Sequence, residues 1–250
     1  MITPCHVVIT MAGMGSRFRA IGYRVPKYRA LARGRPLFDW AIGSLASFIA
    51  VGAHFTFVLR REDDGADFVR QRAASLGIAG VTVIEIDALT DGQATSALRA
   101  TDTADFAGVP LVIYNIDTYV DPASLPVAAV RGDGWIPCFA AAGDAWSFVA
   151  LGPHGRAQEV REKQRISPHA TIGLYHFGSA ALFRELYAET YLRGGKPEAG
   201  ERYVAPMYNA LIARGGAVYV HDVPVTAVVP LGTPAEVLAF DPAAGPNQVV

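Results

Sequence analysis

A chain of 250 residues with 51% hydrophobic and 18% charged side chains can bury a sizeable core, which excludes an intrinsically disordered protein. Its 22 basic and 23 acidic side chains give a formal net charge of -1, which argues against a nucleic-acid-binding protein. Cys5 and Cys138 are too few for a disulfide framework. The small number of cysteines and an N-terminus without a signal-peptide pattern both favour a cytoplasmic protein.

The first half of the chain alternates between strand and helix patterns. Runs of β-branched and aromatic residues predict strands over His6–Ala12, His54–Arg60, Val81–Asp87 and Pro110–Asp117. Apolar residues at helical spacing predict helices over Leu37–Val51, Asp63–Leu76 and Gln93–Ala100. This order predicts an α/β fold with a Rossmann-like, doubly wound and mainly parallel sheet that helices cover on both faces.

The longest apolar stretch, Leu37–Leu59, approaches the length of a membrane span. Polar residues interrupt it, among them Asp39 and His54, and its first apolar residues fall on one helical stripe. Gly52 suits the end of a helix. We therefore expect a buried helix followed by a strand, and no membrane association.

The pattern becomes mixed and irregular in the second half. Short strands are predicted within residues 135–141, 146–151, 157–163, 171–177 and 217–223, and helices within residues 179–192 and 203–216. Thr233, Pro234 and Glu236 have the pattern of a capping box that begins a helix. Because no repeat or linker interrupts the chain, a single domain over residues 1–250 is expected.

The loop over residues 11–27 follows the first predicted strand and combines glycines with cationic side chains. Gly13 and Gly15 let backbone N–H groups approach an anion closely, while Arg17 and Lys27 can neutralise phosphate. Ligands of open α/β sheets bind beyond the carboxyl ends of the strands. The dinucleotide fingerprint and the P-loop are both absent. The loop alone therefore fits either an anion site or an ordinary turn with surface charges.

A longer pattern is more specific. Gly13-x-Gly15-x-Arg17-Phe18, followed after a short spacer by Pro26-Lys27, resembles the signature of the sugar-phosphate nucleotidylyltransferases, also called nucleotide-sugar pyrophosphorylases. Segments similar to the later motifs of this family follow in the family's order: DGQATSAL (91–98), VIYNIDTYVD (112–121), VREKQRISPHATIGLYHF (160–177), ERYVAPMYNALIARGG (201–216) and VPLGTPAEVLAF (229–240). On these motifs, the chain is identified as a member of the family.

The resemblance implies that a phosphate oxygen of a small phosphorylated acceptor attacks the α-phosphorus of a nucleoside triphosphate and that pyrophosphate leaves. It implies nucleotide binding by Ala12, Gly13, Gly15, Gly92 and Gln93, catalytic roles for Arg17, Lys27 and Lys163, acceptor binding by Glu162, Lys163 and Gly173, and Mg²⁺ binding by Asp117. About residues 1–120 would then form the nucleotide-binding half, and about residues 121–250 the acceptor-binding half.

Simpler roles exist for two of these residues, and the family pattern has gaps. Asp117 could merely start a turn, and Lys163 could be a solvated surface charge. Pro230 stands where many family members carry a second metal-binding aspartate, and Ile116 replaces a common glycine. Water or Asp222 could fill the missing ligand position. We favour water, because Mg²⁺ keeps several waters and needs only one or two carboxylates.

Three functions are left open. The first is an enzyme that activates a sugar phosphate, or a similar compound, as a precursor of a surface polysaccharide. The second is a cytidylyltransferase for a non-sugar phosphate, such as an amino-alcohol or amino-acid phosphate. The third is a non-catalytic nucleotide-binding relative. The retained Arg17, Lys27, Asp117 and Lys163 favour an enzyme. The sequence names neither the base nor the acceptor, and it leaves a homo-oligomer open.

Overall fold

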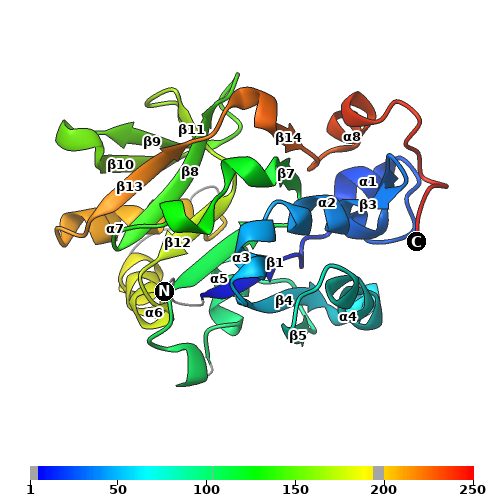
Figure 1. The fold of residues 1–250 in the computed structure, drawn as a ribbon, viewed down its shortest axis with the longest axis horizontal. Coiled ribbons are helices and arrows are strands. Elements are labelled where there is room, and N and C mark those ends of the chain that lie inside the picture. Colours follow the sequence, from blue (N-terminus) through cyan, green and yellow to red (C-terminus); the bar gives the residue numbers. More distant parts are fainter. Residues whose placement is uncertain (1–4, 103, 194–199) are drawn as a thin grey trace.

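The computed structural model describes residues 5–102, 104–193 and 200–250, and a ten-stranded sheet lies at their centre (Figure 1). The strands run in the order β10-β9-β11-β8-β12-β6-β1-β4-β5, with β13 paired to β8. All pairings among the strands of the first half are parallel. These strands are β1 (His6–Thr10), β4 (His54–Arg60), β5 (Gly80–Ile86) and β6 (Leu111–Asn115).

The second half continues the same sheet with mostly antiparallel pairs. Only β13 pairs in parallel, with β8. The strands are β8 (Gly134–Ala140), β9 (Ser147–Leu151), β10 (Ala157–Glu162), β11 (His169–Thr171), β12 (Leu174–Phe177) and β13 (Val218–Asp222). The predicted α/β fold, with a parallel first part and a mixed second part, is confirmed.

Two small sheets lie apart from the central one. They are formed by β2 (Leu31–Ala32) with β3 (Arg35–Pro36), and by β7 (Thr118–Val120) with β14 (Val228–Pro230). The α-helices are α1 (Ser16–Ala20), α2 (Leu37–Gly43), α3 (Ala46–Ala50), α4 (Ala66–Ser75), α5 (Gln93–Arg99), α6 (Ala180–Tyr187), α7 (Tyr208–Ala213) and α8 (Pro234–Phe240). Within the described residues, no helix combines the length and the apolarity that a bilayer crossing requires.

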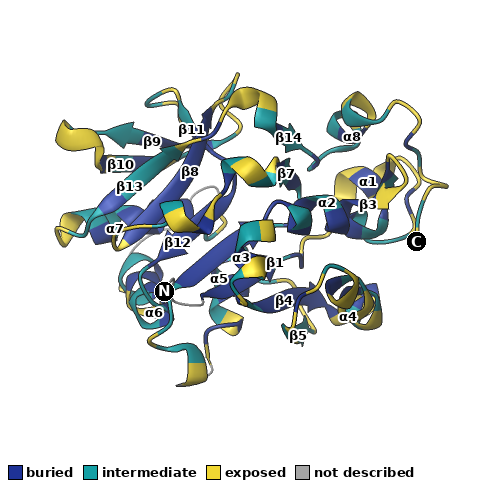
Figure 2. Ribbon diagram, in the orientation of Figure 1, coloured by how far each residue is buried: buried dark blue, intermediate teal, exposed yellow. Residues whose placement is uncertain are grey.

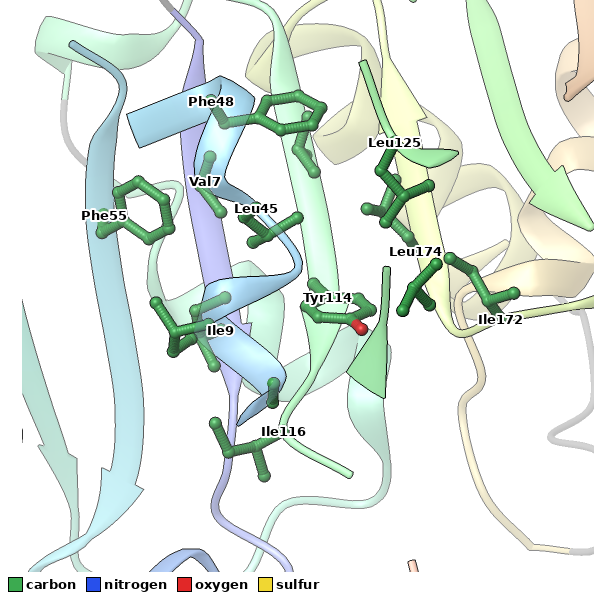
Figure 3. Close-up of a cluster of buried hydrophobic side chains, with 14 of the residues drawn as sticks. Val7, Ile9, Leu45, Phe48, Phe55, Tyr114, Ile116, Leu125, Ile172 and Leu174 are labelled. Carbon is green, nitrogen blue, oxygen red and sulfur yellow. The ribbon is translucent and has the colours of Figure 1, made fainter. Parts of the chain in front are cut away.

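Side chains of the central strands alternate between two apolar clusters, one on each face of the sheet. In β1, Val7 and Ile9 pack into the cluster that contains Leu45 and Phe48, whereas Val8 belongs to the opposite cluster. This alternation follows from the two-residue period of a strand. Figure 3 shows the first cluster, and Figure 2 shows the buried strands inside more exposed helices.

The capping box predicted at the last helix is confirmed: the side chains of Thr233 and Glu236 each accept a hydrogen bond from the other residue's backbone. A third apolar cluster joins α8 to the loop around α1 through Val237 and Phe18. This packing places α8 beside α1, as Figure 1 shows.

Two predicted elements are broken. The helix predicted over Leu37–Val51 is split into α2 and α3, because Leu45, with a ψ of 22°, leaves the helical conformation; the preceding Ser44 is buried and accepts a hydrogen bond through Oγ from the backbone N–H of Val120. The strand predicted within residues 171–177 is split into β11 and β12. Gly173 lies between them with a φ of +81°, a backbone conformation that L-residues other than glycine rarely adopt.

Candidate active site

A cavity of about 820 Å³ lies at the carboxyl ends of β1 and β6. The loop after β1, the turn after β6, the end of β10 and the segment between β14 and α8 all contribute to its wall. Every site residue predicted from the sequence lines it except Gly15: Ala12, Gly13, Arg17, Lys27, Gly92, Gln93, Asp117, Glu162, Lys163 and Gly173. Residues far apart in the sequence thus meet at the edge where α/β proteins bind ligands.

The loop after β1 is shaped by Gly15, which has a φ of +61° and precedes α1. Phe18 is buried and fixes the start of the helix against the apolar cluster beneath it. A Cβ at Gly13 would meet nothing within 4 Å, so a ligand can approach the backbone there. Arg17 lines the cavity and is exposed, which leaves its guanidinium available to a phosphate.

Lys27 and Asp117 form an ion pair in the wall of the cavity. The Nζ atom of Lys27 donates to Asp117 Oδ2 at 2.8 Å, and the two side chains are 18% and 32% exposed. Lys27 begins a short 3₁₀ helix after Pro26, whereas Asp117 lies in the turn between β6 and β7. A cation and a carboxylate therefore lie side by side, where a phosphate and a metal ion could each find a partner.

The structure places a second carboxylate in this wall, on Glu236 at the start of α8. Asp222 takes no part in the cavity: it is 83% exposed at the end of β13, beside the His169 imidazole. Across the described residues, no three side chains of His, Cys, Asp or Glu converge in a group that could hold a metal ion. Asp117 and Glu236 nevertheless offer the oxygen donors that Mg²⁺ prefers.

The segment that begins α5 forms another part of the wall. Gln93, the first residue of α5, donates through Nε2 to Asn115 Oδ1 and to Thr10 Oγ1, the latter at 3.4 Å. These hydrogen bonds join the helix to the carboxyl ends of β1 and β6. Gln93 thus lies beside the loop of Gly13, as the predicted nucleotide-binding role requires.

Gly92 is held by a segment from the second half of the chain. The backbone N–H of Arg202 donates to the Asp91 carbonyl at 2.7 Å, and the Arg202 carbonyl accepts from Ala94 N–H at 2.9 Å. A Cβ at Gly92 would lie 2.5 Å from the backbone N and O atoms of Arg202, and the φ of Gly92 is +140°. Only glycine fits this close approach.

Lys163 and Glu162 line the cavity at the end of β10. Lys163 Nζ donates to the hydroxyl of Tyr203 at 2.7 Å, and this hydrogen bond raises the pKa of the lysine, so that it stays cationic at neutral pH. The side chain of Glu162 is only 8% exposed and accepts a hydrogen bond from Ser147 Oγ. Lys163 has a φ of +51°, which is uncommon for a residue other than glycine.

Gly173, which is predicted to bind the acceptor, lies against Asn115 at the end of β6. A Cβ at Gly173 would lie 2.5 Å from Asn115 Nδ2, so a side chain there would displace Asn115. Beside it, the hydroxyls of Tyr175 and Thr171 lie 3.0 Å apart. Burial raises the pKa of Tyr175, with a smaller contribution from the nearby carboxylate of Glu162, and this keeps the phenol neutral.

Several lining residues were not predicted as site residues, among them Asn115, Ser147, Tyr203 and Glu236. Asn115 and Tyr203 lie inside segments that resemble the family, but nothing local in the sequence shows that they meet Gly173 or Lys163. The two cysteines do not line the cavity. Burial raises the pKa of both thiols, which keeps them protonated at neutral pH.

Comparison with solved structures finds a close likeness to a nucleotide-sugar enzyme. The solved structure of a nucleoside-diphosphate-sugar pyrophosphorylase from Vibrio cholerae RC9 has 33% sequence identity to this chain and a TM-score of 0.83. The alignment covers 94% of this chain and 98% of that one. The inositol-1-phosphate CTP transferase from T. maritima, at 15% identity and a TM-score of 0.73, covers 94% of this chain and 91% of its own. This second likeness shows the fold alone. Neither a scan against protein-family models nor a search of curated proteins found a match.

Proposed function

Since this chain belongs to the sugar-phosphate nucleotidyltransferases, which are enzymes, we propose that its cavity transfers a nucleotidyl group from a nucleoside triphosphate to a small phosphorylated acceptor. The acceptor would be a sugar phosphate or a similar phospho-compound, activated in the cytoplasm as a precursor of a surface polysaccharide. The observation that carries the proposal is the ion pair of Lys27 and Asp117 in one cavity with Gly13, Arg17 and Lys163.

In the proposed reaction, an oxygen of the acceptor phosphate attacks the α-phosphorus and forms a new P–O bond. The bond between the α-phosphorus and the bridging oxygen breaks, and its electron pair leaves with pyrophosphate. Phosphoryl transfer of this kind asks the protein mainly for in-line positioning and for cations near the developing negative charge.

Different residues of the cavity would supply the positioning and the positive charges that this reaction needs. Backbone N–H groups near Gly13 and the guanidinium of Arg17 would bind the triphosphate and then the leaving pyrophosphate. Lys27 would stabilise charge at the α-phosphate. At the end of β10, Lys163 would bind the acceptor phosphate while the carboxylate of Glu162 accepts hydrogen bonds from acceptor hydroxyls.

Asp117 is the proposed protein ligand for Mg²⁺, which when bound would neutralise part of the negative charge of the triphosphate. The fit rests on the carboxylate of Asp117, which is one-third exposed and faces a cavity with room for a nucleotide. Lys27 now neutralises this carboxylate. When nucleotide and Mg²⁺ are bound, the ammonium of Lys27 would either share the Asp117 carboxylate with the ion or turn toward the α-phosphate.

The test measures pyrophosphate release with each of ATP, GTP, CTP, UTP and dTTP, paired with a panel of sugar 1-phosphates, inositol 1-phosphate and phosphocholine. Selective release with a sugar 1-phosphate supports the proposed function. Selective release with CTP and a non-sugar phosphate would favour the cytidylyltransferase. Nucleotide binding without any release would favour a non-catalytic relative.

Lys27→Met removes the positive charge expected near the α-phosphate but keeps a side chain of similar size in the cavity wall. We expect turnover to fall about 10²–10³-fold, because a preorganised electrostatic group is removed. Arg24→Met is the matched control, since Arg24 lies in the same loop and does not line the cavity. Wild-type turnover in Lys27→Met would remove this lysine from the mechanism.

A further inference from the structure

The metal side of the cavity lacks a carboxylate that the sequence resemblance led us to expect. Pro230 ends β14 and lies opposite Thr118 of β7 in the register of the small sheet. The next residue, Leu231, donates its backbone N–H to the Asp117 carbonyl at 2.8 Å. Position 230 is therefore beside Asp117, but a proline side chain offers no oxygen to an ion.

Glu236 brings a carboxylate to the same place from the first turn of α8. The backbone N–H of Thr233 donates to Glu236 Oε2 at 2.8 Å, and Glu236 N–H donates to Thr233 Oγ1 at 3.2 Å. This capping box fixes the direction of the carboxylate. A carboxylate can accept about four hydrogen bonds or ligand contacts, so one bond to Thr233 leaves most of its capacity free.

Gly232 shows how near the two carboxylates are. A Cβ at this position would lie 3.4 Å from Asp117 Oδ2 and 3.5 Å from Glu236 Oε2. One small space thus touches an oxygen of each residue. The φ of Gly232 is not positive, so its backbone conformation does not require glycine. An alanine would fit the fold there and would fill the space with a methyl group.

The charges around this space favour a cation. Asp117 and Glu236 carry two negative charges, and Lys27 supplies one positive charge at 2.8 Å from Asp117 Oδ2. In the part of the chain that the structure describes, no ion pair involves Glu236. The three side chains leave a net negative charge in a half-buried wall, where a divalent cation is attracted more strongly than in bulk water.

We infer that Glu236 is the second acidic ligand of the magnesium site, and that Gly232 keeps the space between it and Asp117 open. Mg²⁺ in proteins is usually bound by one or two carboxylates together with waters and phosphate oxygens. The inference rests on the proposed function in one respect: a bound nucleoside triphosphate would supply the remaining oxygen ligands. It replaces both earlier candidates, water alone and Asp222, at the position that Pro230 leaves vacant.

The experiment titrates the full-length protein with Mn²⁺ as the probe and follows the free ion by electron paramagnetic resonance. Titrations are made on the protein alone and with an α,β-methylene analogue of CTP and of UTP. Glu236→Gln should weaken Mn²⁺ binding about tenfold or more. Its melting temperature should stay near that of the wild type, because glutamine also forms a capping box. Asp222→Asn, which removes a charge outside the cavity, should bind Mn²⁺ like the wild type.

Gly232→Ala provides a second variant that does not alter any charge. Its methyl group would lie at ordinary van der Waals distance from both oxygens, so we expect a wild-type melting temperature and weakened Mn²⁺ binding. Wild-type Mn²⁺ affinity in Glu236→Gln, or no Mn²⁺ binding by the wild type in any titration, would overturn the inference. Binding that depends on Glu236 in a protein without pyrophosphate release would contradict the proposed function alone.

Discussion

Lys163 is the site residue with the least ordinary local structure. Its φ of +51° turns the chain at the end of β10, and its ammonium donates to the Tyr203 hydroxyl. A left-handed conformation costs a residue other than glycine about 1 kcal/mol or more. Such a cost at the edge of a cavity is consistent with a residue that is placed to meet a ligand.

We expect Lys163→Ala to raise the KM for the acceptor at least tenfold and to change the KM for the triphosphate much less. The reason is that Lys163 lines the cavity directly after β10, in the predicted acceptor-binding half, and a charge-assisted hydrogen bond to phosphate is worth about 1.5–3 kcal/mol. Steady-state kinetics with each substrate varied in turn gives the two values. Arg161→Ala, two residues earlier on β10 and outside the cavity, is the control. Equal effects on both substrates would refute the assignment to the acceptor.

Sequence analysis can single out candidate site residues where their chemistry is local. Gly13, Arg17 and Lys27 lie within one loop, so their spacing alone shows the pattern. It fails where a role depends on a distant partner. Nothing near Glu236 in the sequence reveals that its carboxylate lies beside Asp117, because a capping box explains the residue completely on its own.

At the scale of elements, the segment that carries Arg202 and Tyr203 connects the two sides of the cavity. The backbone of Arg202 pairs with residues on both sides of Gly92, while the hydroxyl of Tyr203 accepts from Lys163. One short segment thus contacts both the predicted nucleotide side and the predicted acceptor side. It positions groups from both halves of the chain.

Gly92→Ala should therefore disturb the nucleotide side through the backbone. An alanine Cβ would lie 2.5 Å from two backbone atoms of Arg202, so one of the segments must move, and the φ of +140° adds strain. We expect a loss of about 1–3 kcal/mol in the free energy of unfolding and a KM for the triphosphate raised at least tenfold.

Urea unfolding and steady-state kinetics measure these two effects. Gly108→Ala is the matched control, because a Cβ at Gly108 would meet nothing within 4 Å and its φ is not positive. An unchanged KM for the triphosphate in Gly92→Ala would show that the contact with Arg202 has no part in nucleotide binding.

The strands of the first half were predictable because each is a continuous run rich in β-branched and apolar residues between helices. His54–Arg60 is reproduced to the residue. The helix of Leu37–Val51 was predicted as one piece because its apolar periodicity continues through Ser44. It breaks beside Ser44, whose Oγ is hydrogen-bonded to Val120, far away in the sequence. The irregular second half depends on such distant pairings throughout, which sequence periodicity does not encode.

At the scale of the whole molecule, the fold buries two histidines away from the cavity. His6 on β1 and His176 on β12 are 0% and 3% exposed, and the Nδ1 atom of each lies among the described residues without a hydrogen-bond partner. Burial lowers the pKa of both imidazoles to about 4, with a smaller contribution from His54 in the case of His6. Neither histidine lines the candidate active site.

These two histidines should make the whole fold sensitive to mild acid. In the unfolded chain each imidazole takes up a proton near pH 6.5, whereas in the folded protein it does so only near pH 4. Between these values the unfolded state binds more protons, so the free energy of unfolding falls as the pH is lowered, by up to about 1.4 kcal/mol per pH unit for each histidine. Urea unfolding at pH 7, 6 and 5 measures this slope in a range where most carboxylates stay ionised. The double variant His6→Gln/His176→Gln, although less stable at pH 7, should have a clearly smaller slope. If its slope equals that of the wild type, other groups cause the acid sensitivity.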